Sequence, residues 1–406
     1  RAYDIRGIYP EEINTDVAKR VGNAVAGYLK AKTIVVGEDG RIGSPELRQA
    51  VIEGITAAGA DVIYIGRCTT PLFYFAVKQT GADGGIMVTA SHNPPEYSGF
   101  KITSRGGAPL GIDEGLLEVK ELADNFVKAV NAGKVMSNTE LKNQYVDFLI
   151  KNSGLKRGTV KLKIALDAGN GTASLIVKPL FEKLAIDYIP LFFDTDGLFL
   201  GRGPDPLREN ALKPLKNAIK DDKADIGIAF DGDADRISVL NEKGDIISPQ
   251  FVLAFLWQSN KGIFSNMKVV YDSRFSRSVR EFFGKHGIRS KVGHTNIART
   301  MKNRHAAIGG ETSGHFFFKE MNYTESSVLA VLRILKILSG SAKTISELVK
   351  PLDKYFYSAE ESVELLRNTD SNKILEALKI KYVNVRVDEF DGLTVEYPEW
   401  WFNVRP

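Results

Sequence analysis

The 406-residue sequence contains a single cysteine, Cys68, which excludes an intrachain disulfide and a cysteine-based metal site. No apolar run reaches the ~18 residues that a membrane span needs, and no signal-peptide pattern opens the chain. The 54 basic and 50 acidic residues are interleaved without a basic block, which argues against nucleic acid as a partner. We therefore expect a cytoplasmic protein with no membrane and no nucleic-acid partner, either a monomer or a homodimer.

The remaining composition is that of an ordinary globular protein, with 43% hydrophobic and 26% charged residues. A chain of 406 residues is too long for a single core, so we expect two to four domains. The sequence does not begin with Met and stops at Pro406. We expect the natural protein to continue beyond these ends.

Three segments of the chain repeat the same order of predicted elements. Each begins with a short aliphatic run that ends in Asp, typical of a buried parallel strand, at Lys32–Asp39, Lys161–Asp167 and Lys268–Asp272. A helix, a second strand, a second helix and a third strand follow each run. Alternating strands and helices predict parallel sheets with helices on both faces. We expect three similar α/β domains, over residues 1–135, 136–245 and 246–350.

The pattern changes after residue 350. A short helical stretch at Ser371–Leu378 and strands on either side of Asp391-Gly392 predict a smaller α+β domain over residues 351–406. Two neighbouring aromatic residues in its last strand, Trp400 and Trp401, are predicted to fill its core.

Unusual polar runs directly follow the three third strands. They are Ala90–Pro95, Asp231–Arg236 and Gly310–His315. In open α/β sheets, ligands gather beyond the carboxyl ends of the strands. The repeat therefore predicts one functional site built from these three loops.

The second loop carries carboxylates at alternate positions, Asp231, Asp233 and Asp235. So much negative charge in one turn is unfavourable unless a cation lies among it, and oxygen ligands indicate Mg²⁺ or Ca²⁺ rather than zinc. Arg236 could orient one carboxylate or hold a phosphate. A solvated acidic turn is one alternative. An EF-hand that includes Glu242 is another, but Arg236 occupies its glycine position and a strand precedes the run.

The first loop places Ser91 at the end of a strand, followed by two prolines. A turn-capping serine is the alternative interpretation. His92 is next to Ser91, but neighbours along a loop need not touch, so no Ser-His-Asp triad follows. A serine near a hard metal favours phosphoryl chemistry over acyl transfer.

The third loop alternates Glu311, Ser313 and His315, side chains suited to holding sugar hydroxyls, although a plain turn would also explain it. The chain has only five histidines. His92, His294 and His315 lie in or beside the predicted strand-end loops, which favours a functional role for this edge of the sheets.

Together these motifs resemble one family. Thr89–Lys101, Asp231–Arg236, Gly310–His315 and the opening Arg1–Gly7 resemble the α-D-phosphohexomutases, in their phosphomannomutase/phosphoglucomutase branch. The resemblance covers essentially the whole chain. It implies an α/β fold of three similar domains with mixed, mostly parallel sheets, and a C-terminal α+β domain of TATA-binding-like form, around a central cleft.

The resemblance also implies roles for particular residues. Ser91 would carry the phosphoryl group and, with Asp231, Asp233 and Asp235, bind Mg²⁺. The expected catalytic residues are Ser91, Lys101, Arg6, His92 and His315. The expected substrate-binding residues are Arg236, Arg274, Gly293, His294, Glu311, Ser313, His315 and Arg405. Arg405 matches an arginine before the phosphate-binding loop of the fourth domain, which therefore looks truncated in a sequence that ends at Pro406.

The implied reaction interconverts hexose 1-phosphate and hexose 6-phosphate of mannose or glucose through a hexose 1,6-bisphosphate. The runner-up is phosphoglucosamine mutase, since Thr312 replaces the usual Met, Tyr or Gln of the third loop and leaves the sugar preference open. A non-catalytic sugar-phosphate sensor is the alternative from a different class of protein.

Overall fold

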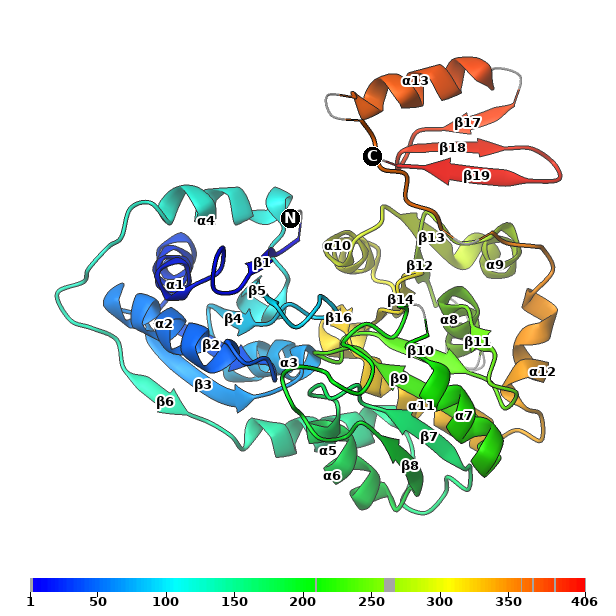
Figure 1. Cartoon of the computed structure of the whole chain (residues 1–406), viewed down its shortest axis with the longest axis horizontal. Coiled ribbons are helices and arrows are strands. Elements are labelled where there is room, and N and C mark those ends of the chain that lie inside the picture. Colours follow the sequence, from blue (N-terminus) through cyan, green and yellow to red (C-terminus); the bar gives the residue numbers. More distant parts are fainter. Residues whose placement is uncertain are drawn as a thin grey trace.

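The computed structural model describes residues 3–208, 210–258, 267–358, 360–366, 369–382 and 385–405. Within these ranges the strands form three mixed sheets and one small antiparallel sheet (Figure 1). The three mixed sheets belong to successive α/β domains, and the fourth sheet belongs to a smaller C-terminal domain, as the sequence predicted. The exact domain boundaries remain predictions.

Domain 1 contains a sheet in the order β1-β5-β4-β2-β3-β6. Its strands are β1 (Ile5–Ile8), β2 (Thr33–Glu38), β3 (Asp61–Arg67), β4 (Gly84–Val88), β5 (Tyr97–Ser104) and β6 (Val135–Ser137). Its helices are α1 (Thr15–Leu29), α2 (Ser44–Ala57), α3 (Thr70–Thr80) and α4 (Leu116–Leu122). Alternate residues of β2 face opposite ways, so Ile34 and Val36 pack with α1 and α2 while Val35 packs with α3.

Domains 2 and 3 repeat this arrangement with sheets in the orders β11-β10-β9-β7-β8 and β13-β12-β14-β15-β16. Domain 2 has β7 (Ile164–Asp167), β8 (Tyr188–Leu191), β9 (Ile226–Phe230), β10 (Ile237–Leu240), β11 (Ile246–Ile247), α5 (Leu141–Ser153), α6 (Ser174–Leu184) and α7 (Lys213–Asp222). Domain 3 has β12 (Val269–Asp272), β13 (Gly287–Ser290), β14 (Ile308–Gly310), β15 (Phe316–Phe318), β16 (Thr324–Glu325), α8 (Pro249–Gln258), α9 (Arg277–Phe283), α10 (His294–Arg304), α11 (Ser327–Ser339) and α12 (Ile345–Val349).

The predicted repeat is correct for the three parallel strands of each domain, but it missed an antiparallel strand in each. β5, β10 and β15 return beside the third strand, where they pair with β4, β9 and β14. These strands follow the polar loops closely, so the sequence pattern merged them with the loops. Each functional loop is therefore the turn of a hairpin, and hydrogen bonds hold both of its ends.

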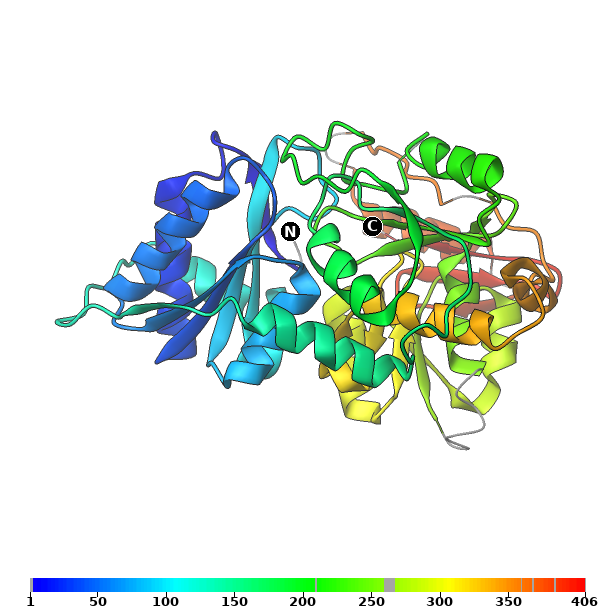
Figure 2. The ribbon, with the colours of Figure 1, turned by 90° about the horizontal axis from the view of Figure 1, so that it is seen from below.

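A continuous buried apolar cluster joins the first three domains. It contains Phe73 from domain 1, Leu166 from domain 2, and Phe251 and Leu335 from domain 3. Helices α5 and α11 cross at the junction (Figures 1 and 2), where the Tyr145 hydroxyl lies 3.1 Å from Ser326 Oγ. Shared burial of this kind fixes the three domains relative to one another.

Domain 4 contains α13 (Ser371–Lys381) and the strands β17 (Arg386–Asp388), β18 (Leu393–Glu396) and β19 (Trp401–Val404). It docks on domain 3 through polar contacts, including Val292 N–H to Asp391 at 2.9 Å and Arg280 to Glu396 at 2.9 Å (Figure 1).

The predicted burial of both tryptophans in domain 4 is wrong for Trp400, which is 44% exposed. Trp400 stacks on Tyr397 with ring centroids 4.2 Å apart, while Trp401 is half-buried beneath Arg280. A sheet of three short strands cannot enclose an aromatic cluster on both faces. None of the helices in the described ranges combines the length and apolar character needed to cross a membrane.

Helices α1 and α2 approach so closely that Gly22 cannot be replaced without movement. A Cβ on Gly22 would overlap the carbonyl oxygen of Val51 in α2. We expect Gly22→Ala to destabilise the protein by about 1–3 kcal/mol through overpacking, seen as a lower midpoint of thermal unfolding.

Gly27, in the same helix, provides the matched control. A Cβ there meets no atom within 4 Å in the part of the chain that the structure describes, so Gly27→Ala should leave the midpoint unchanged or raise it through better helix propensity. Equal midpoints for the two variants would contradict the close helix contact.

Candidate active site

The three polar loops predicted from the sequence meet in the folded chain. A Cβ on Gly232 of the second loop would lie 2.6 Å from the carbonyl oxygen of Ser91 in the first loop. Ile237 N–H, just after the second loop, donates to the carbonyl of Gly314 in the third loop at 3.1 Å. Backbone contacts therefore bring one loop from each α/β domain into a single site.

Ser91 is buried at the end of the first hairpin, in a left-handed backbone conformation with φ of 53°. Its N–H donates to Thr89 Oγ1 at 2.9 Å, and its Oγ donates to Asp231 Oδ2 at 2.9 Å. The hydroxyl of domain 1 thus directly contacts the acidic loop of domain 2, which is the juxtaposition that phosphoryl chemistry requires.

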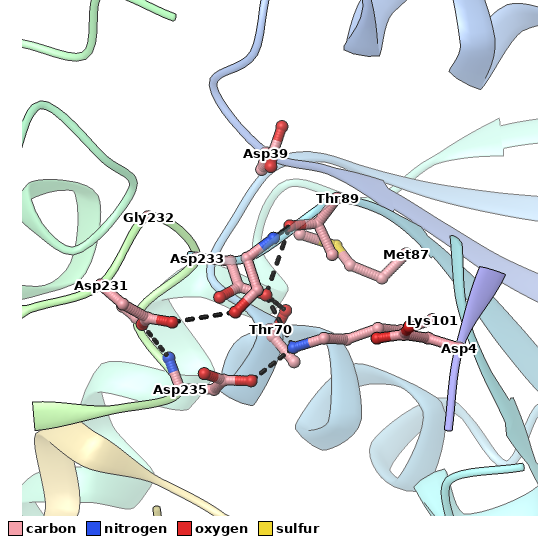
Figure 3. A network of polar contacts seen from close by, with 12 residues as sticks. Asp4, Asp39, Thr70, Met87, Thr89, Lys101, Asp231, Gly232, Asp233 and Asp235 are labelled. Atoms are coloured by element: carbon pink, nitrogen blue, oxygen red, sulfur yellow. Dashed lines mark hydrogen bonds and ion pairs between the residues drawn. The ribbon is translucent and has the colours of Figure 1, made fainter. Parts of the chain in front are cut away.

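The three aspartates form a compact buried cluster. One carboxylate oxygen from each of Asp231, Asp233 and Asp235 lies within 4.8 Å of the others (Figure 3). Within the described ranges, Oδ1 of Asp233 is buried without a hydrogen-bond partner, and the buried Oδ1 of Asp235 makes only long ion-pair contacts, the shorter at 3.4 Å to His315 Nε2. Buried oxygens of this kind are costly unless a cation occupies the cluster, so these residues fit a metal ion with oxygen ligands.

The alternative interpretations of the acidic loop do not fit this geometry. All three carboxylates are buried, which excludes a solvated acidic turn. Glu242 accepts a hydrogen bond from Ser346, and strand β9 leads into the loop where an EF-hand needs a helix.

Lys101, from β5, lies among these carboxylates. Its ammonium donates to Asp233 Oδ2 at 2.8 Å and to Asp235 Oδ2, as Figure 3 shows. Burial lowers the pKa of Lys101, but the two aspartates outweigh this effect and raise it above its usual value. Lys101 therefore carries a proton here.

The charges within the cluster are divided unequally. Burial and the neighbouring carboxylates raise the pKa of Asp231 well above its usual range. Burial also acts on Asp235, but Lys101 and His315 outweigh it and hold the pKa of that carboxyl well below its usual range. Thr70 and Thr89 add hydrogen bonds to Asp233 at 2.7 and 3.3 Å.

Two further predicted residues, Arg6 and His92, lie close to Ser91. Arg6 of β1 pairs with Asp4 and donates to the carbonyl of Ala90 at 3.0 Å and to Asn93 Oδ1 at 2.6 Å. His92 Nδ1 lies 3.3 Å from Ser91 Oγ. Burial, with Arg236 and Arg6 nearby, lowers the pKa of His92 to about 2, so its ring is neutral.

Side chains of the third loop form a chain of polar contacts that ends at residues of the second loop. Glu311 Oε2 and Ser313 Oγ each lie 2.9 Å from His315 Nδ1. His315 Nε2 lies 3.1 Å from Arg236 Nε and 3.4 Å from Asp235 Oδ1. A neutral His315 can accept from Arg236, whereas a protonated one can donate to Asp235.

Charge favours the protonated form of His315. Burial and Arg236 lower the pKa of His315, but Asp235 and Glu311 outweigh them and raise it to about 9. Burial raises the pKa of Glu311, yet its hydrogen bond and charge contact with His315 lower it to about 2. Glu311 and His315 therefore form a buried ion pair.

Gly293 and His294 lie where α10 begins, beside this ion pair. Gly293 N–H donates to Glu311 Oε1 at 2.8 Å. The His294 ring lies 5.4 Å from Tyr3 and 6.3 Å from His315, and burial together with His315 lowers its pKa to about 4. Two histidines of the site, His92 and His294, are thus neutral at pH 7.

The remaining predicted residues, Arg274 and Arg405, lie where domain 3 meets domain 4. Arg274 pairs with Asp272 at 2.8 Å and with Glu360 at 3.1 Å, and Arg405 lies 3.6 Å from the same Glu360. These two arginines therefore lie together at the domain junction. The structure brings the other predicted residues together around Ser91 and the aspartates.

Several residues that shape the site were not predicted from the sequence. Thr70 lies on α3 and has no sequence signal, because only the fold brings it to Asp233. Glu325 is buried with its Oε1 accepting from Tyr74 at 3.0 Å, and it belongs to a second compact group with Asp235 and His315. Arg41 did have a signal, an arginine two residues after the Asp that follows β2.

The fold and site define a class of α/β enzyme in which one domain supplies a serine and another supplies a carboxylate cluster that fits a metal ion. Models of the phosphoglucomutase/phosphomannomutase α/β/α domains I, II and III match residues 1–125, 143–244 and 249–355. The chain belongs to the phosphoglucomutase/phosphomannomutase family, among the α-D-phosphohexomutases.

Individual relatives agree with this assignment. The chain is 36% identical to a phosphomannomutase of Methanocaldococcus jannaschii, over 100% of this chain and 90% of that protein. It is 35% identical to a phosphoglucomutase of Neisseria gonorrhoeae, over 98% of this chain and 88% of that protein.

A crystal structure of a phosphoglucomutase/phosphomannomutase family protein from Burkholderia thailandensis matches with a TM-score of 0.87 and 32% identity, over 99% of this chain and 88% of that chain. The predicted family and enzyme class are confirmed. The protein is a mutase of the isomerase class with phosphohexomutase activity.

The orphaned Oδ1 of Asp233 predicts that one divalent cation binds per chain. Asp233→Asn removes a charged ligand, and we expect it to weaken binding of Mn²⁺ or Mg²⁺ by about 100-fold or more in isothermal titration calorimetry.

The control is Asp221→Asn, on the exposed surface of α7 in the same domain, which should bind the ion as the wild type does. Unchanged affinity in Asp233→Asn would remove the cluster as the metal site.

Proposed function

We propose that the protein interconverts hexose 1-phosphate and hexose 6-phosphate, of mannose or glucose, by passing a phosphoryl group through Ser91. The observation that carries the proposal is the 2.9 Å hydrogen bond from Ser91 Oγ to Asp231 within the buried carboxylate cluster. A phosphoryl group carried on a serine in this position can pass to the free end of a bound hexose phosphate, and the phosphoryl group at the other end can then return to the serine. The sugar is then a hexose 1,6-bisphosphate between the two transfers.

The carboxylate cluster would hold Mg²⁺ through Asp231, Asp233 and Asp235, with an oxygen on Ser91 as a further ligand. Such an ion supplies positive charge against the phosphoryl oxygens. The orphaned Oδ1 of Asp233 supports this assignment.

Lys101 and Arg6 act on the reacting groups from domain 1. Lys101 holds a proton between Asp233 and Asp235, so it can donate that proton to the sugar oxygen that leaves the phosphoryl group. In the opposite transfer, from phosphoserine to a sugar hydroxyl, Lys101 must begin neutral and take the hydroxyl proton. Arg6 braces the serine loop through Ala90 and Asn93 and brings positive charge close to Ser91.

His92 and His315 would complete the catalytic set. The neutral His92 ring, 3.3 Å from Ser91 Oγ, can orient the hydroxyl, whose proton is directed to Asp231. His315 carries charge between Asp235 and Glu311 and can donate to a sugar or phosphate oxygen.

Substrate recognition would use groups that can bind either end of the sugar, because the bisphosphate must reverse its orientation in the site between the two transfers. Ring hydroxyls would contact Gly293, His294, Glu311, Ser313 and His315. Phosphate would contact Arg236, Arg274 and Arg405. Arg274 and Arg405 both face the half-exposed junction of domains 3 and 4, where a carboxylate, Glu360, now pairs with them.

The phosphoserine step predicts a covalent change at Ser91. After incubation with glucose 1,6-bisphosphate, peptide mass spectrometry should find one phosphoryl group on Ser91. Ser91→Ala should lose this modification and reduce turnover of hexose phosphate by about 1,000-fold or more, as expected for removal of a nucleophile.

Ser98 supplies a matched control, since it is buried in β5 of the same hairpin and its hydroxyl has no hydrogen-bond partner in the described ranges. Ser98→Ala should retain both phosphorylation and turnover. Unmodified Ser91 together with absent turnover in the wild type would favour the sugar-phosphate sensor.

The choice of sugar is tested by comparing kcat/KM for mannose, glucose and glucosamine 1-phosphates. We expect mannose or glucose 1-phosphate to react at least about tenfold faster than glucosamine 1-phosphate, because the hairpin from Pro95 to Lys101 resembles the phosphomannomutase branch. The highest kcat/KM for glucosamine 1-phosphate would instead identify a phosphoglucosamine mutase.

A further inference from the structure

Each α/β domain places a buried aspartate at the same point, where its first parallel strand ends. These residues are Asp39, Asp167 and Asp272, and each is fully buried. In each case Oδ1 accepts a hydrogen bond from the backbone N–H two residues later. The distances are 3.0 Å to Arg41, 2.8 Å to Gly169 and 2.8 Å to Arg274.

The other oxygen of each aspartate pairs with an arginine. Asp39 Oδ2 accepts from Arg41 at 3.1 Å, and Asp272 Oδ2 accepts from Arg274 at 2.8 Å. In both domains the arginine is two residues beyond the aspartate. Domain 2 makes the same pair from a different part of the chain, because Asp167 Oδ2 accepts from Arg202 at 2.8 Å.

Gly169 explains how domain 2 accommodates an arginine from elsewhere. It occupies the position that corresponds to Arg41, with a positive φ of 55°. A Cβ on Gly169 would lie 2.6 Å from the guanidinium of Arg202. The space of the missing side chain is therefore filled by Arg202, and the aspartate–arginine pair is retained although the sequence order differs.

Arg41 connects this pair to the serine loop. Its side chain is 1% exposed, and all five of its N–H groups have acceptors. One acceptor is Asp39, and the other four are backbone carbonyls. These carbonyls belong to Ser91 at 2.8 Å, Asn93 at 2.7 Å, Pro94 at 2.7 Å and Tyr97 at 2.9 Å.

Arg202 connects its pair to the aspartate loop. Its side chain is also 1% exposed, and it donates to the carbonyl of Phe230, the residue directly before Asp231. In domain 3 the aspartate makes the corresponding contact itself, since Asp272 Oδ2 accepts from Thr312 N–H at 2.8 Å. Each pair thus holds the functional loop of its own domain.

A buried ion pair contributes little net stability compared with apolar packing, so stability alone does not account for these arginines. Their shared feature is contact with the loops that carry the reacting groups. The Ser91–Asp231 contact joins two domains, so it depends on where each loop lies relative to its own sheet. Arg41 fixes one loop and Arg202 fixes the other.

We propose that Arg41 and Arg202 are positioning residues, which hold the Ser91 loop and the Asp231 loop in register across the domain junction. This inference rests on the proposed function of Ser91. A lysine can keep the charge beside the aspartate but lacks the planar fork that reaches several carbonyls at once.

Arg41→Lys should therefore lower kcat by about 100-fold, because small displacements of a reacting group are costly. KM for hexose phosphate should change by less than about threefold, since the proposed sugar and phosphate contacts lie in the other domains. The control is Arg48→Lys in domain 1. Arg48 pairs with Glu38, the residue before Asp39, and lies over Tyr64, so this variant should keep wild-type kcat.

Arg202→Lys should displace the Asp231 loop, which carries the proposed metal ligands. We expect the Mg²⁺ concentration for half-maximal activity to rise about tenfold, an effect typical of groups that orient metal ligands. Arg41→Lys should raise that concentration less, because Ser91 supplies only one of the proposed ligands. The control is Arg157→Lys, also in domain 2, whose side chain donates to the carbonyls of Glu182 and Lys183 at the end of α6.

The outcomes separate the two proposals. A wild type with neither phosphoserine nor turnover overturns the proposed function itself. An active wild type whose Arg41→Lys and Arg202→Lys variants match it in kcat and Mg²⁺ requirement overturns the positioning role alone. Global unfolding of both variants, seen by circular dichroism, also overturns it, because the arginines would then serve stability.

Discussion

Concentrated negative charge is the constraint on which this structure depends. Three buried carboxylates, Asp231, Asp233 and Asp235, share one turn, and in the described ranges Oδ1 of Asp233 has no hydrogen-bond partner. Such a turn is stable only if positive charge and hydrogen-bond donors surround it. Lys101 and the hydroxyl of Ser91 come to it from domain 1, and His315 comes from domain 3. The site therefore exists only where the three domains meet.

That requirement accounts for how the domains are joined. Domains 1 to 3 share one buried apolar cluster, which holds the three hairpin loops at fixed separations. Domain 4 is attached differently, through contacts such as Arg280 with Glu396 and Val292 N–H with Asp391. The reacting groups lie on the three domains that share this core, and the polar junction with domain 4 lies beside the arginines proposed to hold phosphate.

Each of the three α/β domains repeats the same hairpin and loop, but the loops carry different side chains. A parallel strand leads into a polar loop, and an antiparallel strand leads out of it, so each loop is held at both ends. A buried aspartate at the end of the neighbouring strand anchors the loop from the side. The three loops can then differ, as a serine, a set of aspartates and a Glu–His pair, without a change in the scaffold.

The sequence by itself determined the order of strands and helices, the three repeats and the residues in the polar loops, because these follow from local periodicity and composition. It did not determine the returning strands β5, β10 and β15, because each follows a polar loop closely, and β10 and β15 are also too short to show a period. Only the tertiary structure decided that Ser91 meets Asp231, that Thr70 reaches Asp233, and that Arg202 replaces the side chain missing at Gly169. Those contacts join residues far apart in the chain, and nothing in a local pattern encodes them, since they arise from the shared core that brings the domains together.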